Sequence, residues 1–386
     1  MTTFLFTDEQ QDLRRTLRRF LTEKSPPAEV RRLMETETGY DPAVWKQLTG
    51  QLGLAGLAIP ERYGGSGYGP VEQLIACEEM GRALLCAPYL ASVVLAAGAL
   101  LASGDEQAQA DLLPSIADGS VIATLAVPEQ AGSWATSGLR ALASRSAHGY
   151  VLDGGKSFVL DGLIAGLILV AARTEAGPAL FAVDGDAPGL TRRPLQTLDM
   201  TRKQAELTFS STPARVIGAA GKADPMVARA LLGGVIALCA EQAGGAQRCL
   251  DMSVEYAKLR VQFGRPIGSF QAIKHKCADM LLEVESAKSA AYYAAWAAAE
   301  GATDGAPGGA PGGGPGLPLA ASLAKAYCSE AYSHVAAENI QIHGGIGFTW
   351  EHDAHLYYRR ARSAEVMFGT PAHHREIAAT QLIDIS

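Results

Sequence analysis

The spacing of apolar residues changes twice along the chain, and these changes limit the folds open to it. As far as Asp118-Gly119, apolar residues recur every three or four positions, which is typical of amphipathic helices. Short apolar runs between Gly-rich turns follow, and from Pro225 the helical spacing returns and continues to the C-terminus. The sequence therefore predicts a mainly α protein with a small antiparallel β-barrel or sandwich at its centre, in domains of residues 1–118, 119–224 and 225–386.

The elements of the first two domains can be placed from capping residues, prolines and turns. Thr7 and Gln10 have the spacing of a capping box, and Pro26-Pro27 is expected to end the first helix. Further helices are expected at Pro42–Leu52, Val71–Leu84, Ala91–Ala102 and Glu106–Ile116. Strands are expected at Val121–Val127, Leu139–Ala143, Tyr150–Leu152, Ser157–Leu160, Leu167–Ala172, Ala179–Val183 and Ala205–Phe209. In the last domain, Gly301–Leu317 is too rich in Gly and Pro for a helix, and a flexible loop is expected.

Charge and composition argue against several classes of function. The formal net charge of −7 does not favour nucleic acid. The N-terminus turns polar by Thr7, and no apolar run has the length of a membrane span, so neither a secretory signal nor a span is expected. The six cysteines are scattered without a C-x-x-C pair, which indicates reduced thiols and a cytoplasmic location. There is no metal-ligand spacing, and His373-His374 is expected to be solvated.

The stretch Tyr256–Met280 carries the clearest candidate binding residues. Gly264, Pro266 and Gly268 interrupt what is otherwise helix on both sides. Arg260 can hold two phosphate oxygens, Phe263 offers a flat aromatic face, and Gln271 adds a neutral donor and acceptor. These residue types at a helix–loop–helix corner could suit a dinucleotide, although a charged, capped turn explains them as well.

The residues RVQFGRPIGSFQ within this stretch resemble the R-x-Q-F-G-x-P-I-x-x-x-Q signature of the acyl-CoA dehydrogenases. The resemblance implies an N-terminal helical domain, a middle antiparallel β-barrel and a C-terminal four-helix bundle. It also implies FAD held between barrel and bundle, with a neighbouring subunit closing over the adenine end. A homotetramer or an α2β2 heterotetramer is therefore expected.

Three further motifs support the resemblance and extend the expected FAD site. LAVPEQAGS (125–133) resembles the family's flavin loop V-T-E-P-x-A-G-S, although it is one residue shorter and has Pro128 at the usual Thr. KSFVLDG (156–162) resembles K-x-W-I-T-N-G, and QIHGGIGF (341–348) resembles the diphosphate loop Q-x-x-G-G-x-G-Y/F. Gly369-Thr370 matches a G-T pair at the flavin edge. The FAD-binding residues expected from all motifs are Leu125, Val127, Pro128, Ser133, Phe158, Val159, Leu160, Arg260, Phe263, Gln271, Gln341, Gly344, Gly345, Gly369 and Thr370.

The resemblance implies an oxidoreductase that removes a proton from Cα of an acyl-CoA and passes a hydride from Cβ to flavin N5. In most members the base is the Glu before the G-T pair, but here that residue is Phe368. Glu241 is the only charged residue between Arg229 and Arg248, in an apolar helix, and some members carry their base on that helix. We therefore expect Glu241 to be a relocated base, with a buried glutamate paired with an arginine at a subunit interface as the alternative interpretation. Glu365 is the second candidate.

Two other functions remain compatible with these residues. The chain could be a non-catalytic or half-site partner subunit of a heteromeric acyl-CoA dehydrogenase, or a flavin-dependent monooxygenase on the same fold. In the dehydrogenase interpretation, the expected partners are an acyl-CoA of lipid metabolism and electron-transfer flavoprotein or a similar acceptor.

Overall fold

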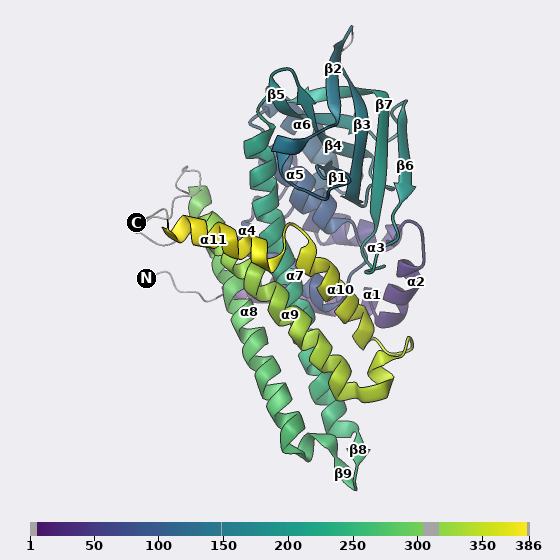
Figure 1. Cartoon of the computed structure of the whole chain (residues 1–386), viewed down its shortest axis with the longest axis vertical. Coiled ribbons are helices and arrows are strands. Elements are labelled where there is room, and N and C mark those ends of the chain that lie inside the picture. The colour runs from purple at the N-terminus through teal and green to yellow at the C-terminus, as the bar shows by residue number, and fades with distance from the viewer. Residues whose placement is uncertain (1–5, 148, 304–315, 384–386) are drawn as a thin grey trace. The chain divides into compact units, whose positions relative to one another are not determined.

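The structure is a computed structural model that describes residues 6–147, 149–303 and 316–383. It is mainly α with one central sheet, as predicted, and Figure 1 follows the chain through helices, strands and helices again. Contacts divide the chain into two compact units. The first unit takes its described residues from Met1–Val30, Gly69–Leu85 and Val235–Ser386, and the second consists of Arg31–Tyr68 and Cys86–Gly234. The three-domain division of the chain stays a prediction.

The N-terminal helices of the first unit are joined by buried charges. Helix α1 (Asp8–Lys24) begins at the predicted capping box, in which Thr7 and Gln10 exchange hydrogen bonds. It lies against α4 (Pro70–Arg82), to which two arginines bind two adjacent glutamates: Arg14–Glu78 at 2.5 Å and Arg18–Glu79 at 2.6 Å. Because both glutamates are buried, the arginines are needed to keep these charges paired.

The rest of the first unit is a helical bundle. Its helices are the later part of α7 (Ala223–Leu259), α8 (Gln271–Thr303), α9 (Leu317–His343), α10 (Ala354–Val366) and α11 (Pro371–Ile383), with a 3₁₀ segment at Gly344–Phe348 and a two-strand hairpin, β8 (Val261–Gln262) and β9 (Arg265–Pro266). Helices α8 and α9 run along each other (Figure 1). The expected loop at Gly301–Leu317 falls largely on residues 304–315, outside the described residues. Helix α9 begins at the last residue of that expected loop.

Helix α7 packs closely on α4 because glycines remove the side chains between them. A Cβ at Gly81 would overlap the backbone of Glu241, and one at Gly244 would overlap the carbonyl of Glu78. Within the described ranges, α7 is also the one helix with the length and apolar composition of a membrane span. Since 61% of its most apolar window is buried in the fold, this composition fits a core helix equally well.

The helices of the second unit are α3 (Pro42–Lys46), α5 (Ala97–Ala102) and α6 (Glu106–Ala117), with 3₁₀ turns at Leu54–Gly56, Glu61–Tyr63 and Thr136–Gly138 and π-helical segments at Gln47–Gln51 and Leu90–Ala96; α2 (Pro27–Met34) precedes them. Of these, α3 and α5 are shorter than the predicted helices, whereas α6 agrees with its prediction to within one residue. The helix predicted for Pro42–Leu52 is α-helical only as far as Lys46 and continues as a π-helix to Gln51. This widened segment contains Thr49, which lies so close to Gly119 that no Cβ would fit there.

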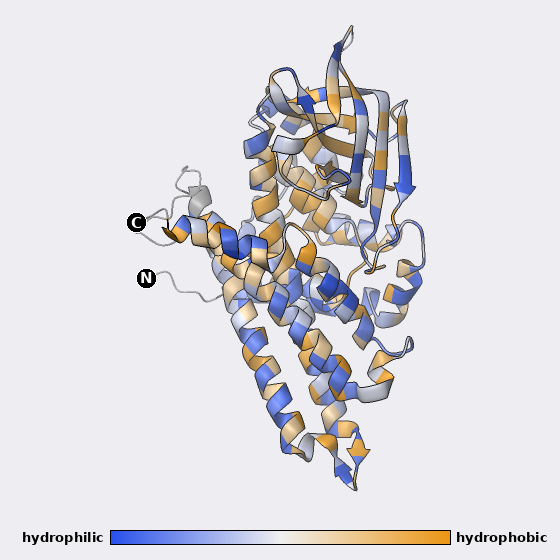
Figure 2. Cartoon of the chain, in the orientation of Figure 1, coloured by the Kyte–Doolittle hydropathy of each residue, from blue (hydrophilic) through white to orange (hydrophobic). Residues whose placement is uncertain are grey.

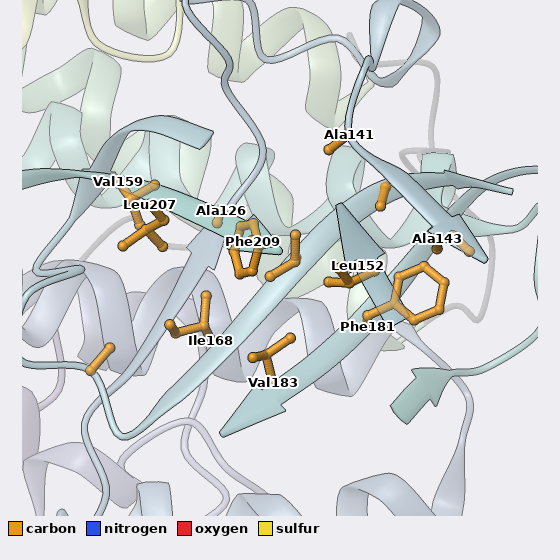
Figure 3. Packing of buried hydrophobic residues seen from close by; sticks show 14 of the residues in the cluster. Ala126, Ala141, Ala143, Leu152, Val159, Ile168, Phe181, Val183, Leu207 and Phe209 are labelled. Atoms are coloured by element: carbon orange, nitrogen blue, oxygen red, sulfur yellow. The ribbon is translucent and has the colours of Figure 1, made fainter. Parts of the chain in front are cut away.

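The strands of the second unit close into a barrel. They are β1 (Ala123–Ala126), β2 (Leu142–Ser146), β3 (Gly149–Leu160), β4 (Leu167–Thr174), β5 (Gly177–Asp184), β6 (Leu190–Pro194) and β7 (Gln204–Ile217). Neighbours follow the order β4-β2-β3-β7-β5, and β5 pairs again with β4 to complete the ring. Most pairings are antiparallel, but β1 and β2 each pair in parallel with β4. Figure 3 shows the apolar side chains that fill the interior, including Leu152, Ile168, Phe181 and Phe209.

Strand β3 joins two runs that the sequence predicted as separate strands. The glycines expected to form a turn instead form a bulge, with a register shift between Leu152 and Gly154 against β7. Gly154 has φ +127°, and a Cβ there would lie 2.8 Å from Cα of Ala141. A second shift, between Lys156 and Val159, contains Phe158 at φ +58°. Strand β6 was missed because its residues, LTRRP, carry no apolar run.

Candidate functional site

One end of the bundle presents the Arg260 stretch to solvent. Arg260 follows the last residue of α7, and its carbonyl accepts from Ile267 N–H at 2.8 Å, which closes the β8–β9 hairpin. Phe263 lies in the turn of that hairpin at φ +52°, with 90% of its surface exposed. In the part of the chain that the structure describes, the Arg260 guanidinium has no ion-pair partner. Gln271 is the exposed first residue of α8, and its side-chain amide lies 3.4 Å from Nε2 of His275.

The Gly344-Gly345 loop lies at the same end. The rings of Tyr256, near the end of α7, and His343, the last residue of α9, are 4.4 Å apart. Gly344 ends α9 at φ +64°, and nothing lies within 4 Å of a Cβ added to either glycine. The two motifs that sequence analysis assigned to the FAD diphosphate and adenine are therefore brought together by the fold, around open space. Figure 2 shows that apolar segments lie among polar ones at this end.

In the second unit, a buried lysine fixes the loop after β1. Lys156 is fully buried in β3, and its ammonium donates to the carbonyl of Val127 at 3.1 Å and to the Glu129 carboxylate at 2.9 Å. Burial lowers the pKa of Lys156, and Glu129 partly offsets that effect. Burial alone would raise the pKa of Glu129, but bonds from Ala141 N–H and from the lysine lower it. Ser157 N–H also donates to the carbonyl of Pro128, at 2.9 Å, so the loop is tied to β3 at two points.

The flavin-loop residues divide into buried and exposed side chains. Phe158 is 43% exposed beside this loop, and a Cβ on Gly132 would lie 3.7 Å from its ring. Ser133 is exposed, and its hydroxyl accepts from Ala135 N–H at 3.1 Å. The remaining residues predicted here are buried: Leu125, Val127, Pro128, Val159 and Leu160. Only their backbone groups are suited to contact a bound molecule.

Glu241 is buried and paired. It is 8% exposed, and its Oε2 lies 3.7 Å from Nη1 of Arg360, which is also buried. The two glycines one helical turn after Glu241 lie against other helices: Gly244 admits α4, and Gly245 faces the ring of Tyr332 on α9. The first unit therefore uses this face of α7 for helix packing, and Glu241 pairs with an arginine of its own chain, Arg360.

Glu365 is also engaged. Its Oε2 accepts from the Ser333 hydroxyl at 2.8 Å and lies 2.5 Å from Nη1 of Arg362. Both candidate carboxylates thus lie beside an arginine.

The turn after α10 contains Phe368, Gly369 and Thr370, and two buried side chains to which sequence analysis gave no role in the site hold it. Lys325, from α9, donates to three carbonyls around the turn, and His374, from α11, contacts the carbonyl of Phe368. The expectation that His374 is solvated is wrong, because it is 5% exposed. The sequence did contain a pattern that could have identified Lys325 as a buried lysine. It is the one charged residue in LAASLAKAY, a run of mostly small and apolar residues.

These arrangements fit the cofactor that the motifs imply. An unpaired guanidinium and an open pair of glycines suit a diphosphate, because glycines let backbone N–H groups approach phosphate oxygens. A half-exposed aromatic ring beside a fixed loop suits a flat heterocycle. Arg260 and the Gly344-Gly345 pair lie in the first unit, whereas Phe158 and the loop after β1 lie in the second unit.

Comparisons with known proteins agree with one another. Family profiles described as "Acyl-CoA dehydrogenase, N-terminal domain", "middle domain" and "C-terminal domain" match residues 7–120, 124–212 and 225–383. The chain is 36% identical to "Acyl-CoA dehydrogenase IpdE2" of Mycobacterium tuberculosis, over 94% of each chain. Among solved structures, it resembles the ChsE4-ChsE5 complex of M. tuberculosis (30% identity, TM-score 0.87, 99% of each chain). It also resembles butyryl-CoA dehydrogenase from Megasphaera elsdenii (27% identity, TM-score 0.88, 98% of this chain and 99% of that one).

Proposed function

From the premise that this chain belongs to the acyl-CoA dehydrogenase family, whose members are FAD-dependent oxidoreductases that act on CH–CH bonds, we propose that it forms part of a two-chain dehydrogenase. In this proposal the chain binds FAD and helps to bind the acyl-CoA, while the base that removes the Cα proton comes from an unlike partner.

The side chain before Gly369-Thr370 carries this proposal. Phe368 is 6% exposed and cannot accept a proton. The two carboxylates that could replace it, Glu241 and Glu365, are each bound by an arginine. A general base must reach the substrate proton, and both of these carboxylates already contact other side chains of the protein.

The residues that would hold FAD are those of the two motif sets. Arg260, Gln271 and the Gly344-Gly345 backbone would hold the diphosphate and adenine part. Phe158, Ser133 and the backbone of the Val127 loop would hold the ring, with Thr370 at its edge. Bound FAD supplies the two-electron acceptor for the hydride from Cβ, and electron-transfer flavoprotein or a similar protein would reoxidise it. The buried Leu160 and Val159 would exclude water from the barrel side of the site.

The exposed end of the bundle supports an assembly. Its apolar side chains are largely uncovered in the single chain: Leu259, Val261, Phe263, Ile346 and Phe348. Such a patch around an otherwise polar motif is typical of a protein interface. A related structure is a complex named for two proteins, ChsE4 and ChsE5. We therefore favour an α2β2 tetramer over four identical chains.

Anaerobic mixing with a panel of acyl-CoA thioesters tests the proposal. The chain purified alone should not bleach its flavin absorbance. A second family chain from the same genome, with Glu before its Gly-Thr pair, should restore bleaching when co-expressed with it. Bleaching by the lone chain would refute the proposal.

The relocated base expected at Glu241 is the alternative to a base from the partner, because this carboxylate is 8% exposed within an apolar stretch of α7. If it abstracts the Cα proton, the lone chain should bleach, and Glu241→Gln should slow bleaching by about 10²–10⁴-fold. Glu365→Gln serves as its control and should cost much less.

A further inference from the structure

We propose that Lys325 and His374 are positioning residues that hold the Phe368–Thr370 turn in a fixed shape, so that its backbone is ready for the flavin edge whatever side chain precedes Gly369. This inference rests on the proposed function for its consequence, but its structural part can be tested without FAD.

Lys325 is placed to fasten the end of α10 to the turn. Its side chain is 0% exposed, and its ammonium donates to the carbonyls of Ala364 (3.2 Å), Glu365 (3.1 Å) and Gly369 (3.1 Å) and to the hydroxyl of Ser329 (2.9 Å). Two of the carbonyls belong to the last turn of α10, where helical carbonyls lack partners and a positive charge is favoured. The third belongs to the turn itself.

The Lys325 ammonium donates to these carbonyls instead of forming an ion pair with a carboxylate. Across residues 6–147, 149–303 and 316–383 no carboxylate lies within ion-pair distance of its ammonium. A buried lysine without a carboxylate costs free energy unless its donors are all engaged. Four acceptors from α9, α10 and the turn meet that need, so removing the ammonium would leave three carbonyls without this partner.

His374 also contacts the turn. Its Nε2 lies 3.0 Å from the carbonyl of Phe368, and its Nδ1 lies 3.4 Å from the Ser322 hydroxyl. A carbonyl only accepts, so Nε2 must carry the proton and donate. Burial lowers the pKa of His374 to about 4, so the ring is neutral near pH 7 and Nδ1 accepts from Ser322.

The turn needs such support because its backbone is strained. Phe368 has φ +60° and Gly369 has φ +111°. A side chain such as Phe rarely adopts a positive φ unless its surroundings enforce it. A Cβ on Gly369 would lie 2.6 Å from the ring of His373 and 3.0 Å from that of His374, so the turn is also packed tightly against α11.

Two variant pairs test the proposal. Lys325→Ala removes the ammonium, and Lys288→Ala removes a lysine elsewhere in the same bundle. His374→Leu removes the donor to Phe368, whereas His374→Gln keeps an N–H that can replace it. Two quantities are measured for each variant: amide hydrogen exchange of residues 366–372 in the FAD-free protein, and the FAD dissociation constant of the assembled enzyme.

The Lys325→Ala and His374→Leu variants should exchange these amides at least about tenfold faster and bind FAD at least about tenfold more weakly, as expected for lost charged or buried hydrogen bonds. Propylammonium, but not propanol, should reverse both effects in Lys325→Ala, because it refills the space with a charged donor. Lys288→Ala and His374→Gln should stay near the native values.

Unchanged exchange in Lys325→Ala would overturn the positioning role. Faster exchange with unchanged FAD affinity would overturn the link to the flavin and leave the proposed function standing. If the native assembly binds no FAD, the proposed function fails, and the exchange data still decide whether the turn is held. Should Lys325→Ala fail to fold, the His374 pair decides alone.

Discussion

Single buried side chains stabilise the loop after β1 and the turn after α10. Lys156 shows this in the barrel, where one ammonium joins a backbone carbonyl and a carboxylate. Lys156→Met should lower the free energy of unfolding by about 2–4 kcal/mol, because Glu129 loses its charge partner and the Val127 carbonyl loses its donor. Urea titration measures the loss. Arg193→Ala breaks the exposed ion pair with Glu206 and should cost under about 1 kcal/mol; an equal cost for both variants would contradict the buried-pair argument.

His374 should make the chain sensitive to acid. Because its pKa is lowered to about 4, the folded protein leaves it neutral while the unfolded chain binds a proton below about pH 6.5. Stability should therefore fall as pH drops from 6.5 to 4, by roughly 2–3 kcal/mol from this group. The His374→Gln variant should lack this component. Thermal unfolding followed across this pH range would show it, and parallel pH curves for the two proteins would disprove it.

The side chains that sequence reasoning recovered and missed differ in a physical way. Motif residues such as Arg260 and Gly344 stand in long local patterns, so their exposure on one bundle end could be anticipated. Lys325 and His374 are buried, and Lys325 contacts Gly369, which is far from it in the sequence. No local sequence pattern predicts either burial or such a distant contact. The alternative interpretation of Glu241 gave it an arginine partner, but only the fold identifies Arg360 as that partner.

At the scale of elements, α4 and α7 can pack closely because glycines lie where they touch. Gly244→Ala would place a Cβ against the carbonyl of Glu78, and the helices would have to separate. We expect a loss of about 1–3 kcal/mol in the free energy of unfolding. Gly233→Ala, also in α7, has no neighbour closer than 3.9 Å and should be neutral or stabilising by up to about 1 kcal/mol. Chemical denaturation of both variants tests this, and the argument fails if Gly244→Ala is as stable as Gly233→Ala.

Element types were predictable where their patterns were strong. The capping box placed the start of α1 correctly, and most barrel strands lay near their predicted positions. Glycine is common both in turns and in β-bulges, and the sequence does not distinguish the two. Gly154 was assigned to a turn, but it adopts a positive φ in a bulge within β3. Strand β6 could not be predicted because its stability comes from pairing with β7 rather than from its own apolar residues.

For the whole molecule, the exposed bundle end should link cofactor binding to assembly. Arg260→Ala removes an exposed guanidinium without breaking any ion pair within the described residues, so the lone chain should keep its stability. FAD affinity of the assembled enzyme should fall by about 1–3 kcal/mol, the range for a lost charged hydrogen bond. Equilibrium dialysis gives the affinity and light scattering gives the mass. Native FAD affinity in this variant would remove Arg260 from the site.

The uncovered bundle end also has a consequence for the life of the chain inside a cell. Phe263 and Phe348 are 90% and 84% exposed, and surfaces of this kind attract chaperones and proteases until they are covered. Copies made in excess of their counterpart should therefore be degraded faster than copies made in matched amounts. In the proposed two-chain assembly, the cell would then have to make the two chains in equal amounts. The amount of this chain that accumulates would depend on how much partner is present to cover the exposed bundle end.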